Sequence, residues 1–520
     1  MHRPIRTATL LLLLAAATHA ADPGQNPWFR DGRAAVARAR TEVGTTKRAR
    51  NVILFVGDGM GIATVTAARI RQGQLRGGTG EENFLAFERL PFTALSKTYN
   101  TDYQVPDSAG TITAMLTGVK TRAGVLGIDD SIARGDFAGT EAASVPTLLE
   151  RAEDAGLWTG VVTTTTVTHA TPAGTYAHTP DRDWEGDAKM PEAARAAGFP
   201  DIARQLVESP HGDGPEIVLG GGRAFFQPTT AADPEYPERT GTRLDGRDLV
   251  GEWQAKRPGS AYVWNREGLL ALDLGQATRV LGLFEPSHMQ FEDDRARDAA
   301  GEPSLSEMTA AAITLLSRAP KGYFLLVEGG RIDHGHHASN AHRALGDTIE
   351  LSNAVRVALE KTQGTDTLIV VTADHSHTLS MAGYPRRGNP ILGLVSGSSG
   401  EGGPSPGPAK DLTGKPYTTL SYANGPGYPG ASDSQPEGPK TFPHPAKSFQ
   451  GVTRGRPDLT HVDTTAPGYL QEATVPLGSE THGGEDVVVW AGGPSAALFH
   501  GTREQSYVYH VMAAALGLDR

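Results

Sequence analysis

The stretch that decides the fold lies at residues 322–337 and reads G-Y-F-L-L-V-E-G-G-R-I-D-H-G-H-H. Tyr323 to Val327 form a short apolar run bounded by glycines, which is typical of a strand buried on both faces of a parallel sheet. Glu328 follows at the carboxyl end of this strand, and in a subsequent helix Asp333 and His337 would share one face. A carboxylate and an imidazole so placed suit zinc. A solvated turn before a helix would read similarly, so the assignment depends on partners elsewhere in the chain.

Three other segments combine a buried strand with acidic or imidazole side chains. Residues 51–56 read N-V-I-L-F-V and lead into G-D-G-M-G, residues 366–372 lead into A-D-H-S-H, and T-H-G-G-E-D precedes an apolar run at 487–490. The residues concerned are Asp58, Asp374, His375 and His482. Each motif is weak alone, because a glycine turn with an aspartate is common at helix starts. Together, four strand ends that each offer such a group predict a multi-metal site at one edge of a parallel sheet.

Two further segments offer groups for a substrate. Ser108, in P-D-S-A-G-T, would open a helix. A serine there is commonly a plain N-cap, although the N–H groups and the dipole of a helix start also favour a phosphate or an alkoxide. The loop at 164–185 follows a predicted strand and contains His169, Thr171 and Arg182. Arg182 is the candidate anion clamp, with a solvated side chain or a surface ion pair as the alternative.

The composition restricts the class of protein. The 520 residues, 38% of them hydrophobic, allow one large α/β domain with insertions or two to three smaller domains. The chain has no cysteine, so any zinc must be bound by histidines and carboxylates. The formal net charge of -11 argues against nucleic acid or an acidic membrane as a partner. An anionic substrate would therefore need local cations.

The order of segments predicts an exported protein with one interrupted catalytic domain. Residues 1–20 carry two arginines before a short apolar stretch and end in T-H-A, which is typical of a cleaved secretory signal and too short for a membrane span. We expect an N-terminal peripheral segment at 21–48, a catalytic α/β domain at 49–384 and 481–520, and a Gly/Pro-rich inserted subdomain at 385–480. The expected location is periplasmic or secreted.

The motifs together closely resemble those of the alkaline phosphatases. From about Asn51 onward, G-D-G-M-G, P-D-S-A-G-T, H-A-T-P, V-E-G-G-R-I-D-H-G-H-H, T-A-D-H-S-H and T-H-G-G-E-D occur in that family's order. The resemblance implies a three-layer α/β sandwich with a central, mostly parallel sheet, a loop-rich inserted subdomain, and a homodimer. His169 and His334 stand where the best-known bacterial pattern has Asp and Lys, so the chain is more similar to the animal-type enzymes. Those enzymes carry a glycolipid anchor, whereas this sequence ends in L-G-L-D-R, and we expect no membrane anchor.

Matched motif by motif, the resemblance implies two zinc ions and one magnesium ion. One zinc would be bound by Asp333, His337 and His482, and the other by Asp58, Asp374 and His375. Magnesium would be bound by Asp58, Thr171 and Glu328, with His169 reaching it only through water. Mixed nitrogen and oxygen donors suit zinc, whereas a set of oxygens suits magnesium.

The resemblance also implies hydrolysis of phosphate monoesters through a phosphoserine. Ser108 would be the nucleophile and Arg182 would bind two phosphoryl oxygens. The metals and this arginine would supply a positive field, so the acidic net charge is no obstacle to an anionic substrate.

A structural calcium ion is a further expectation from the animal-type pattern. Matching segments give Glu235, Glu285, Glu302 and the main-chain carbonyl of Phe284 as its ligands. Two extra residues precede Glu302, and Glu302 is longer than the family's aspartate at that place. The alternative is an acidic, solvated loop surface.

Two other classes of function remain open on the sequence alone. A phosphodiesterase or a sulfatase of the same metal-dependent superfamily would share the metal ligands. Asp107-Ser108-Ala109 is not a sulfatase motif, and a phosphodiesterase would have less need of both Arg182 and a complete magnesium set. A secreted phosphate-binding or metal-storage protein would turn nothing over.

Overall fold

The computed structural model describes residues 47–256, 258–398 and 403–518. The predicted signal segment and most of the predicted peripheral segment lie outside these residues. Among the residues described, no helix combines the length and the apolar character needed to cross a membrane.

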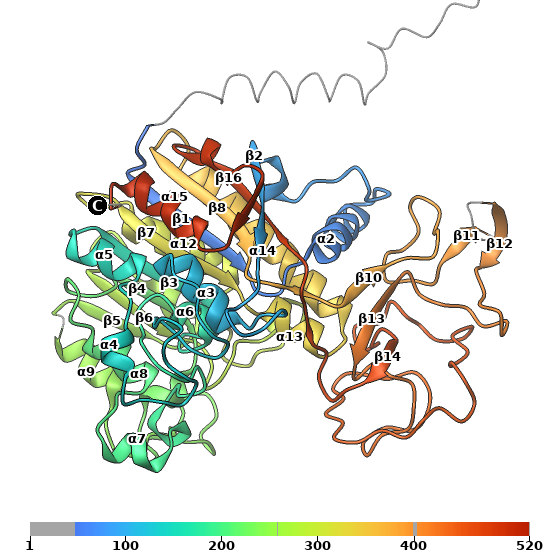
Figure 1. Cartoon of the computed structure of the whole chain (residues 1–520), viewed down its shortest axis with the longest axis horizontal. Helices are drawn as coiled ribbons and strands as arrows, with labels where there is room; N and C mark the ends of the chain where they lie inside the picture. The colour runs from blue at the N-terminus through green and yellow to red at the C-terminus, as the bar shows by residue number, and fades with distance from the viewer. Residues whose placement is uncertain (1–46, 257, 399–402, 519–520) are drawn as a thin grey trace, which may run out of the picture. The chain divides into compact units, whose positions relative to one another are not determined.

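A ten-stranded sheet forms the centre of the fold, in the order β17-β2-β16-β8-β1-β7-β3-β4-β6-β5 (Figure 1). Its strands are β1 Asn51–Gly57, β2 Phe92–Lys97, β3 Trp158–Thr166, β4 Ile217–Gly221, β5 Ser260–Val263, β6 Arg279–Leu283, β7 Tyr323–Gly329, β8 Thr367–Ala373, β16 Val487–Gly492 and β17 Thr502–Glu504. Strand β16 pairs antiparallel with β2 and β8, and the other neighbours pair in parallel. The predicted α/β fold with a mostly parallel central sheet is therefore confirmed.

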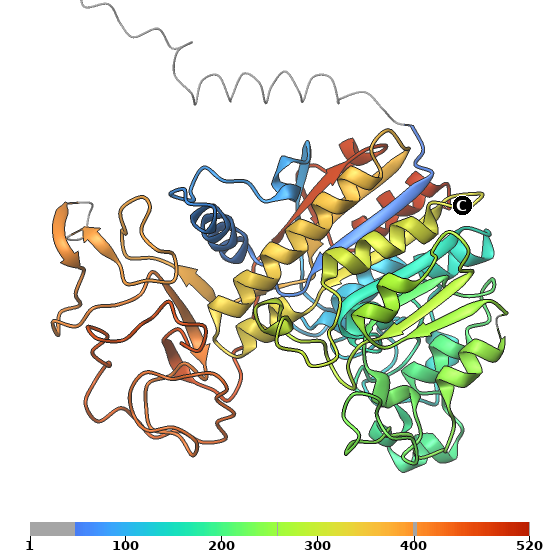
Figure 2. The same ribbon diagram turned by 180° about the vertical axis from the view of Figure 1, so that it is seen from behind.

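Helices cover both faces of this sheet because its central strands are apolar on both sides. In β1, Ile53 and Phe55 belong to one buried cluster, and Val52 and Leu54 belong to the other. The first cluster packs under α2 Ile62–Leu75, α12 Leu305–Leu316 and α14 Ala341–Lys361. The second packs under α3 Ser108–Thr117, α5 Leu148–Asp154, α8 Ile202–Glu208, α9 Leu249–Lys256 and α15 Tyr507–Leu516. Figure 1 looks onto the face with α3, α5 and α15, and Figure 2 onto the opposite face with α12 and α14.

The register of the three central strands brings their carboxyl ends to one level. Gly57 at the end of β1 lies opposite Gly329 of β7 on one side and opposite Ala373 of β8 on the other. The acidic residues that follow or end these strands therefore meet at one edge of the sheet. Shorter helices connect the strands: α4 Thr140–Ala143, α6 Ala170–Ala173, α7 Glu192–Ala196, α10 Arg266–Ala271, α11 Glu292–Arg295 and α13 Arg331–His337.

The described part of the Gly/Pro-rich segment at 385–480 contains only short strands. Strand β13 Leu420–Gly425 pairs with β10 Leu379–Met381 and β14 Ala473–Pro476. Strand β11 Ser396–Ser398 pairs with β12 Pro404–Pro408, and β9 Ser376–His377 pairs with β15 His482–Gly483. The last pair brings the chain back to the sheet edge that carries the acidic residues. The domain boundaries at 384 and 480 stay a prediction.

Candidate active site and metal centre

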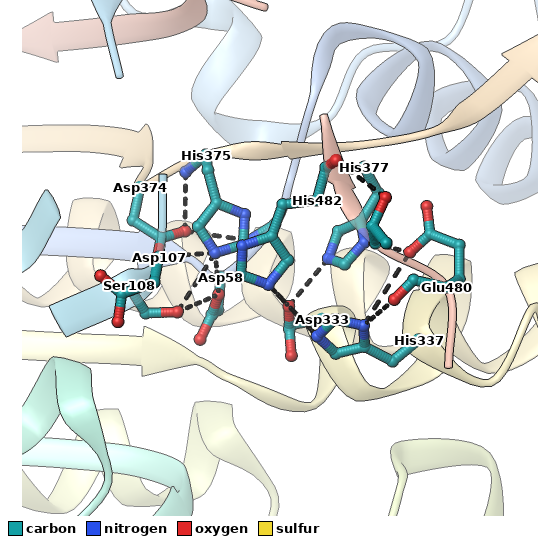
Figure 3. Close-up of polar contacts among 12 residues, drawn as sticks. Asp58, Asp107, Ser108, Asp333, His337, Asp374, His375, His377, Glu480 and His482 are labelled. Carbon is teal, nitrogen blue, oxygen red and sulfur yellow. Dashed lines mark hydrogen bonds and ion pairs between the residues drawn. The ribbon is translucent and has the colours of Figure 1, made fainter. Parts of the chain in front are cut away.

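Asp333, His337 and His482 lie together at the carboxyl edge of the sheet, and we call them the Asp333 centre (Figure 3). Helix α13 begins two residues after β7, so Asp333 and His337 are one helical turn apart, with Asp333 Oδ1 3.3 Å from His337 Nε2. His482 reaches them from β15, and its Nε2 is 3.4 Å from Asp333 Oδ1 and 3.2 Å from His337 Nε2.

The two imidazoles of this centre are held in one tautomer by main-chain carbonyls. Nδ1 of His337 donates to Glu480 O at 2.5 Å, and Nδ1 of His482 donates to Pro106 O at 2.7 Å. Because each Nδ1 carries the hydrogen, each Nε2 keeps a lone pair that faces Asp333. This arrangement is what second-layer hydrogen bonds provide in metal sites.

Asp58, Asp374 and His375 form a second group, which we call the Asp58 centre. His375 Nε2 is 3.4 Å from Asp58 Oδ1 and 3.3 Å from Asp374 Oδ2. Ser108, the first residue of α3, places its Oγ 3.1 Å from the same nitrogen and 3.5 Å from Asp58 Oδ1. The predicted serine therefore lies beside the predicted acidic and imidazole residues, at the amino end of a ten-residue helix.

Arg182 is held from two sides, one of them by the residue that precedes this serine. One of its amino groups donates to Asp107 Oδ2 at 3.2 Å, and the other donates to His169 Nε2 at 3.0 Å. Asp107 is also the N-cap of α3, since its carboxylate accepts from the N–H groups of Ala109 and Gly110. Asp107 thus ties the guanidinium to the helix that carries Ser108.

A third group contains four buried polar atoms that have no hydrogen-bond partner among the described residues. These atoms are Asp58 Oδ2, His169 Nδ1, Thr171 Oγ1 and Glu328 Oε1. Asp58, His169 and Glu328 each place a potential ligand atom close enough to share one ion. Leaving a buried donor or acceptor unpaired costs about 1–3 kcal/mol, so this set strongly favours a bound ion with its water. His169 accepts from Arg182 at Nε2, so in the neutral ring Nδ1 carries the hydrogen.

The electrostatics of the edge also favour cations. Burial and the neighbouring carboxylate of Asp374 raise the pKa of Asp58 well above its usual range, and burial raises the pKa of Glu328 to about 7. Burial would raise the pKa of Asp333 too, but the imidazole of His337 and the hydrogen bond from His377 hold it well below its usual range. Several carboxylates confined together without water are unfavourable unless positive charge accompanies them.

Comparisons with known proteins agree with this geometry. Residues 49–518 match the family model described as "Alkaline phosphatase". The chain belongs to the alkaline phosphatase family. It is 47% identical over 480 residues to a tissue-nonspecific alkaline phosphatase isozyme of Gallus gallus, covering 91% of this chain and 86% of that protein. The human tissue-nonspecific isozyme is 46% identical over 476 residues, covering 90% of this chain and 84% of that protein.

Solved structures show the same fold. The alkaline phosphatase of Thermus thermophilus aligns with a TM-score of 0.63 and 26% identity, covering 96% of each chain. The enzyme of the Antarctic bacterium TAB5 aligns with a TM-score of 0.57 and 20% identity, covering 91% of this chain and 99% of that one. Family membership gives the enzyme class, an alkaline phosphatase acting on phosphate monoesters, and decides against the sulfatase, phosphodiesterase and non-catalytic alternatives.

Three site residues of this phosphatase were not singled out from the sequence. His377 lies with Asp333, His337 and His482, donating Nε2–H to Asp333 Oδ1 at 2.8 Å. Burial opposes its charged form, but the carboxylates of Glu480 and Asp333 raise the pKa of His377 to about 10. The sequence did carry a signal for His377, since alternate residues of an extended segment, such as His375 and His377, share a side. Glu480 had no such signal.

His288 is the third such residue. It lies beside His169 and His334, the two histidines at which the sequence differs from the bacterial pattern. Its ring centroid is 5.4 Å from that of His169 and 4.5 Å from that of His334. Nδ1 of His288 accepts from Thr166 N at 3.1 Å, and Nδ1 of His334 accepts from a guanidinium N–H of Arg331 at 2.8 Å. The three imidazoles therefore lie together, and one of them, His169, also belongs to the group of unpaired atoms around Glu328.

The predicted calcium ligands are only partly brought together. Glu235 and Glu285 lie close to each other, and Asp298 completes their group. Glu302 is nearby, where burial and the charge of Glu285 raise its pKa to about 9. One of its oxygens accepts from Gln290 N at 2.9 Å. We call Glu235, Glu285 and Asp298 the loop cluster.

Proposed function

We propose that this chain hydrolyses phosphate monoesters through a covalent phosphoserine at Ser108, in a site that binds two zinc ions and one magnesium ion. The observation that carries the proposal is the position of Ser108 Oγ, which lies between His375 and Asp58 at the start of α3. Arg182 is fixed by His169 and by Asp107, the residue that precedes Ser108. A nucleophile, an anion clamp and metal-binding groups thus converge on one point.

The side chains present fit these metals. The Asp333 centre and the Asp58 centre each offer imidazole nitrogen with carboxylate oxygen, the donors that zinc prefers in a chain without cysteine. Asp58, Thr171 and Glu328 offer unpaired oxygens, which suit magnesium. His169 would donate Nδ1–H to a water of this ion, because its other nitrogen accepts from Arg182. His377 is not proposed as a ligand, because both of its nitrogens donate to carboxylates.

In the proposed reaction, Arg182 binds two oxygens of the phosphoryl group and orients phosphorus toward Ser108. The serine oxygen forms a bond to phosphorus while the bond to the ester oxygen breaks, releasing the alcohol. Water then attacks phosphorus, frees the serine and yields inorganic phosphate. The bound metals would lower the pKa of the hydroxyl groups that attack and stabilise the oxygens that leave.

A direct test of the intermediate is available. Incubating the enzyme with inorganic phosphate, quenching with acid and mapping peptides by mass spectrometry should locate one phosphate on Ser108. Active enzyme that carries phosphate on another residue, or on none, would contradict the proposal.

We also propose a calcium ion at the loop cluster, with the Phe284 carbonyl as a further ligand. Three carboxylates that lie close together support a hard-oxygen cage, and the oxygens of Asp298 have no hydrogen-bond partner among the described residues. Glu302 also has one buried oxygen, Oε2, without such a partner, and it stays a candidate ligand.

Export to the periplasm or medium and a homodimer complete the proposal. Export rests on the pattern of residues 1–20. The dimer rests on the family resemblance alone. Light scattering on the purified protein would show twice the chain mass for a dimer and the chain mass for a monomer.

A further inference from the structure

Glu480 is a buried carboxylate beside the Asp333 centre that the proposed chemistry does not use. It is 1% exposed and precedes His482 by two residues. Both of its carboxylate oxygens accept hydrogen bonds, and Figure 3 shows the side chain beside His377 and His337. Oε1 accepts from the backbone N–H of Thr378 at 2.7 Å and from its hydroxyl at 2.6 Å, and Oε2 accepts from His377 Nδ1 at 2.5 Å. A carboxylate satisfied in this way is fixed in position.

His377 connects this carboxylate to the metal centre. Its Nδ1–H is taken by Glu480, and its Nε2–H donates to Asp333 Oδ1. That same oxygen faces Nε2 of His337 and Nε2 of His482. With a hydrogen on each nitrogen, the His377 ring has no lone pair for a metal. Its contribution is to fix the orientation of the Asp333 carboxylate.

The main chain of Glu480 acts on the centre from a second direction. Its N–H donates to His337 O at 2.9 Å, and its carbonyl accepts Nδ1–H of His337. One residue therefore sets the orientation of a carboxylate through His377 and the tautomer of His337 directly. Hydrogen bonds of this kind typically change metal affinity by about 10- to 100-fold when they are removed.

We propose that Glu480 is a positioning residue for the Asp333 centre, which fixes His377 and His337 around Asp333 and thereby sets the zinc affinity of that centre. This inference rests on the proposed zinc site. The Asp58 centre should be independent of Glu480, because the imidazole there is His375, whose Nδ1 donates to Ser376 O at 3.2 Å. The expected result of losing the side chain is therefore selective for one of two zinc ions.

If Glu480 had a purely structural role, its replacement should give a different result. Glu480 also joins the segment around Thr378 to the strand pair β9 and β15. If that were its only role, replacement would lower the melting temperature and leave both zinc affinities unchanged. Zinc affinity and melting temperature must therefore be measured on the same variants.

The experiment uses the full chain with Glu480→Ala, Glu480→Gln and the control Glu472→Gln. The Glu472 side chain pairs with Arg456 in the same Gly/Pro-rich segment. Zinc affinities are measured by competition with a chromophoric chelator, and the Asp333 centre is followed by the visible spectrum of cobalt-substituted protein. In Glu480→Ala one zinc should bind about 10- to 100-fold more weakly while the other is unchanged. Turnover lost at limiting zinc should return at saturating zinc.

The conservative variant keeps the test decisive if Glu480→Ala folds poorly. Glu480→Gln retains an oxygen that can accept from His377, so its loss of affinity should be smaller than that of Glu480→Ala. Glu472→Gln should bind both zinc ions as wild type does. Unchanged affinities in both Glu480 variants would overturn this inference alone. A wild type without two tightly bound zinc ions would overturn the proposed metal site, and this inference with it.

Discussion

The edge of the sheet and the loop cluster both gather carboxylates, but they are built differently. At the edge, Asp58 and Asp374 directly follow strands whose register is fixed by parallel pairing on both sides of β1. In the loop cluster, Glu235 lies between η4 Arg223–Phe226 and α9, and Asp298 lies between α11 and α12. The sheet sets the positions of the first group, whereas loop lengths set the positions of the second. We therefore expect catalysis to depend on the first group and only stability on the second.

Removing the proposed nucleophile at the sheet edge should cause the largest loss of activity. Ser108→Ala should lower kcat/KM for p-nitrophenyl phosphate by roughly a thousandfold or more, because the covalent step is lost. Zinc content should not change, since Ser108 is not among the proposed zinc ligands. Thr117→Ser, at the other end of α3, is the matched control and should keep wild-type rates. Near wild-type activity in Ser108→Ala would show that the sheet edge works by another nucleophile.

Removing and restoring metals should show which region supports turnover and which supports only stability. Chelation should abolish activity and lower the melting temperature, because the carboxylates of Asp58, Asp374 and Glu328 then repel one another in a buried place. Zinc with magnesium should restore turnover. Calcium alone should raise the melting temperature without restoring turnover. If calcium alone restored activity, the functional division between the two regions would be wrong.

Arg182→Ala should have a smaller effect than loss of the nucleophile. A charge-assisted hydrogen bond contributes about 1.5–3 kcal/mol, and Arg182 would form two with phosphate, so inhibition by inorganic phosphate should weaken by roughly 100-fold or more while some turnover remains. Arg134→Ala is the control. Arg134 forms ion pairs with Asp181 and Asp183, the two neighbours of Arg182 in the sequence, but its side chain is 46% exposed and is not part of the proposed site. Unchanged phosphate inhibition in Arg182→Ala would make it an ordinary structural arginine.

The sequence predicted what the sheet determines. Runs at 51–56, 323–327 and 366–372 were expected as buried strands, and the structure has β1, β7 and β8 there, because strands covered on both faces must be apolar throughout. The acidic and imidazole groups that follow these strands lie together at the carboxyl edge of the sheet. The N-cap of α3 is Asp107, which leaves the Ser108 hydroxyl outside the capping interaction. That detail depends on side-chain rotamers, which a motif does not specify.

Residues that reach the site through loops were beyond sequence reasoning. Glu480 approaches His377 only because the chain returns through the pairing of β9 with β15. Asp298 reaches Glu235 and Glu285 because the segment before α12 is long enough to fold back. Neither approach has a periodic pattern in the sequence, since it follows from tertiary packing. Glu302 was predicted from its match to a family segment and stays a candidate ligand, whereas Asp298 enters the group through the loop geometry.

The smallest expected effect is on the calcium-dependent melting temperature, and it distinguishes Asp298 from Glu302 as a ligand. In protein stripped of calcium and then refilled, saturating calcium should raise the melting temperature by a few degrees, since a ligand at a hundredfold excess over Kd adds about 2.7 kcal/mol to the free energy of unfolding. Asp298→Asn should lose most of this rise, because it removes one of three clustered carboxylates. Glu302→Gln should lose less, because one Glu302 oxygen already accepts a hydrogen bond from Gln290 N.

Asp213→Asn is the control. Asp213 belongs to another acidic group, in which it forms an ion pair with Arg279. Equal calcium-dependent shifts in wild type and Asp298→Asn would exclude Asp298 as a ligand, and a larger loss in Glu302→Gln would restore the ligand set expected from the sequence.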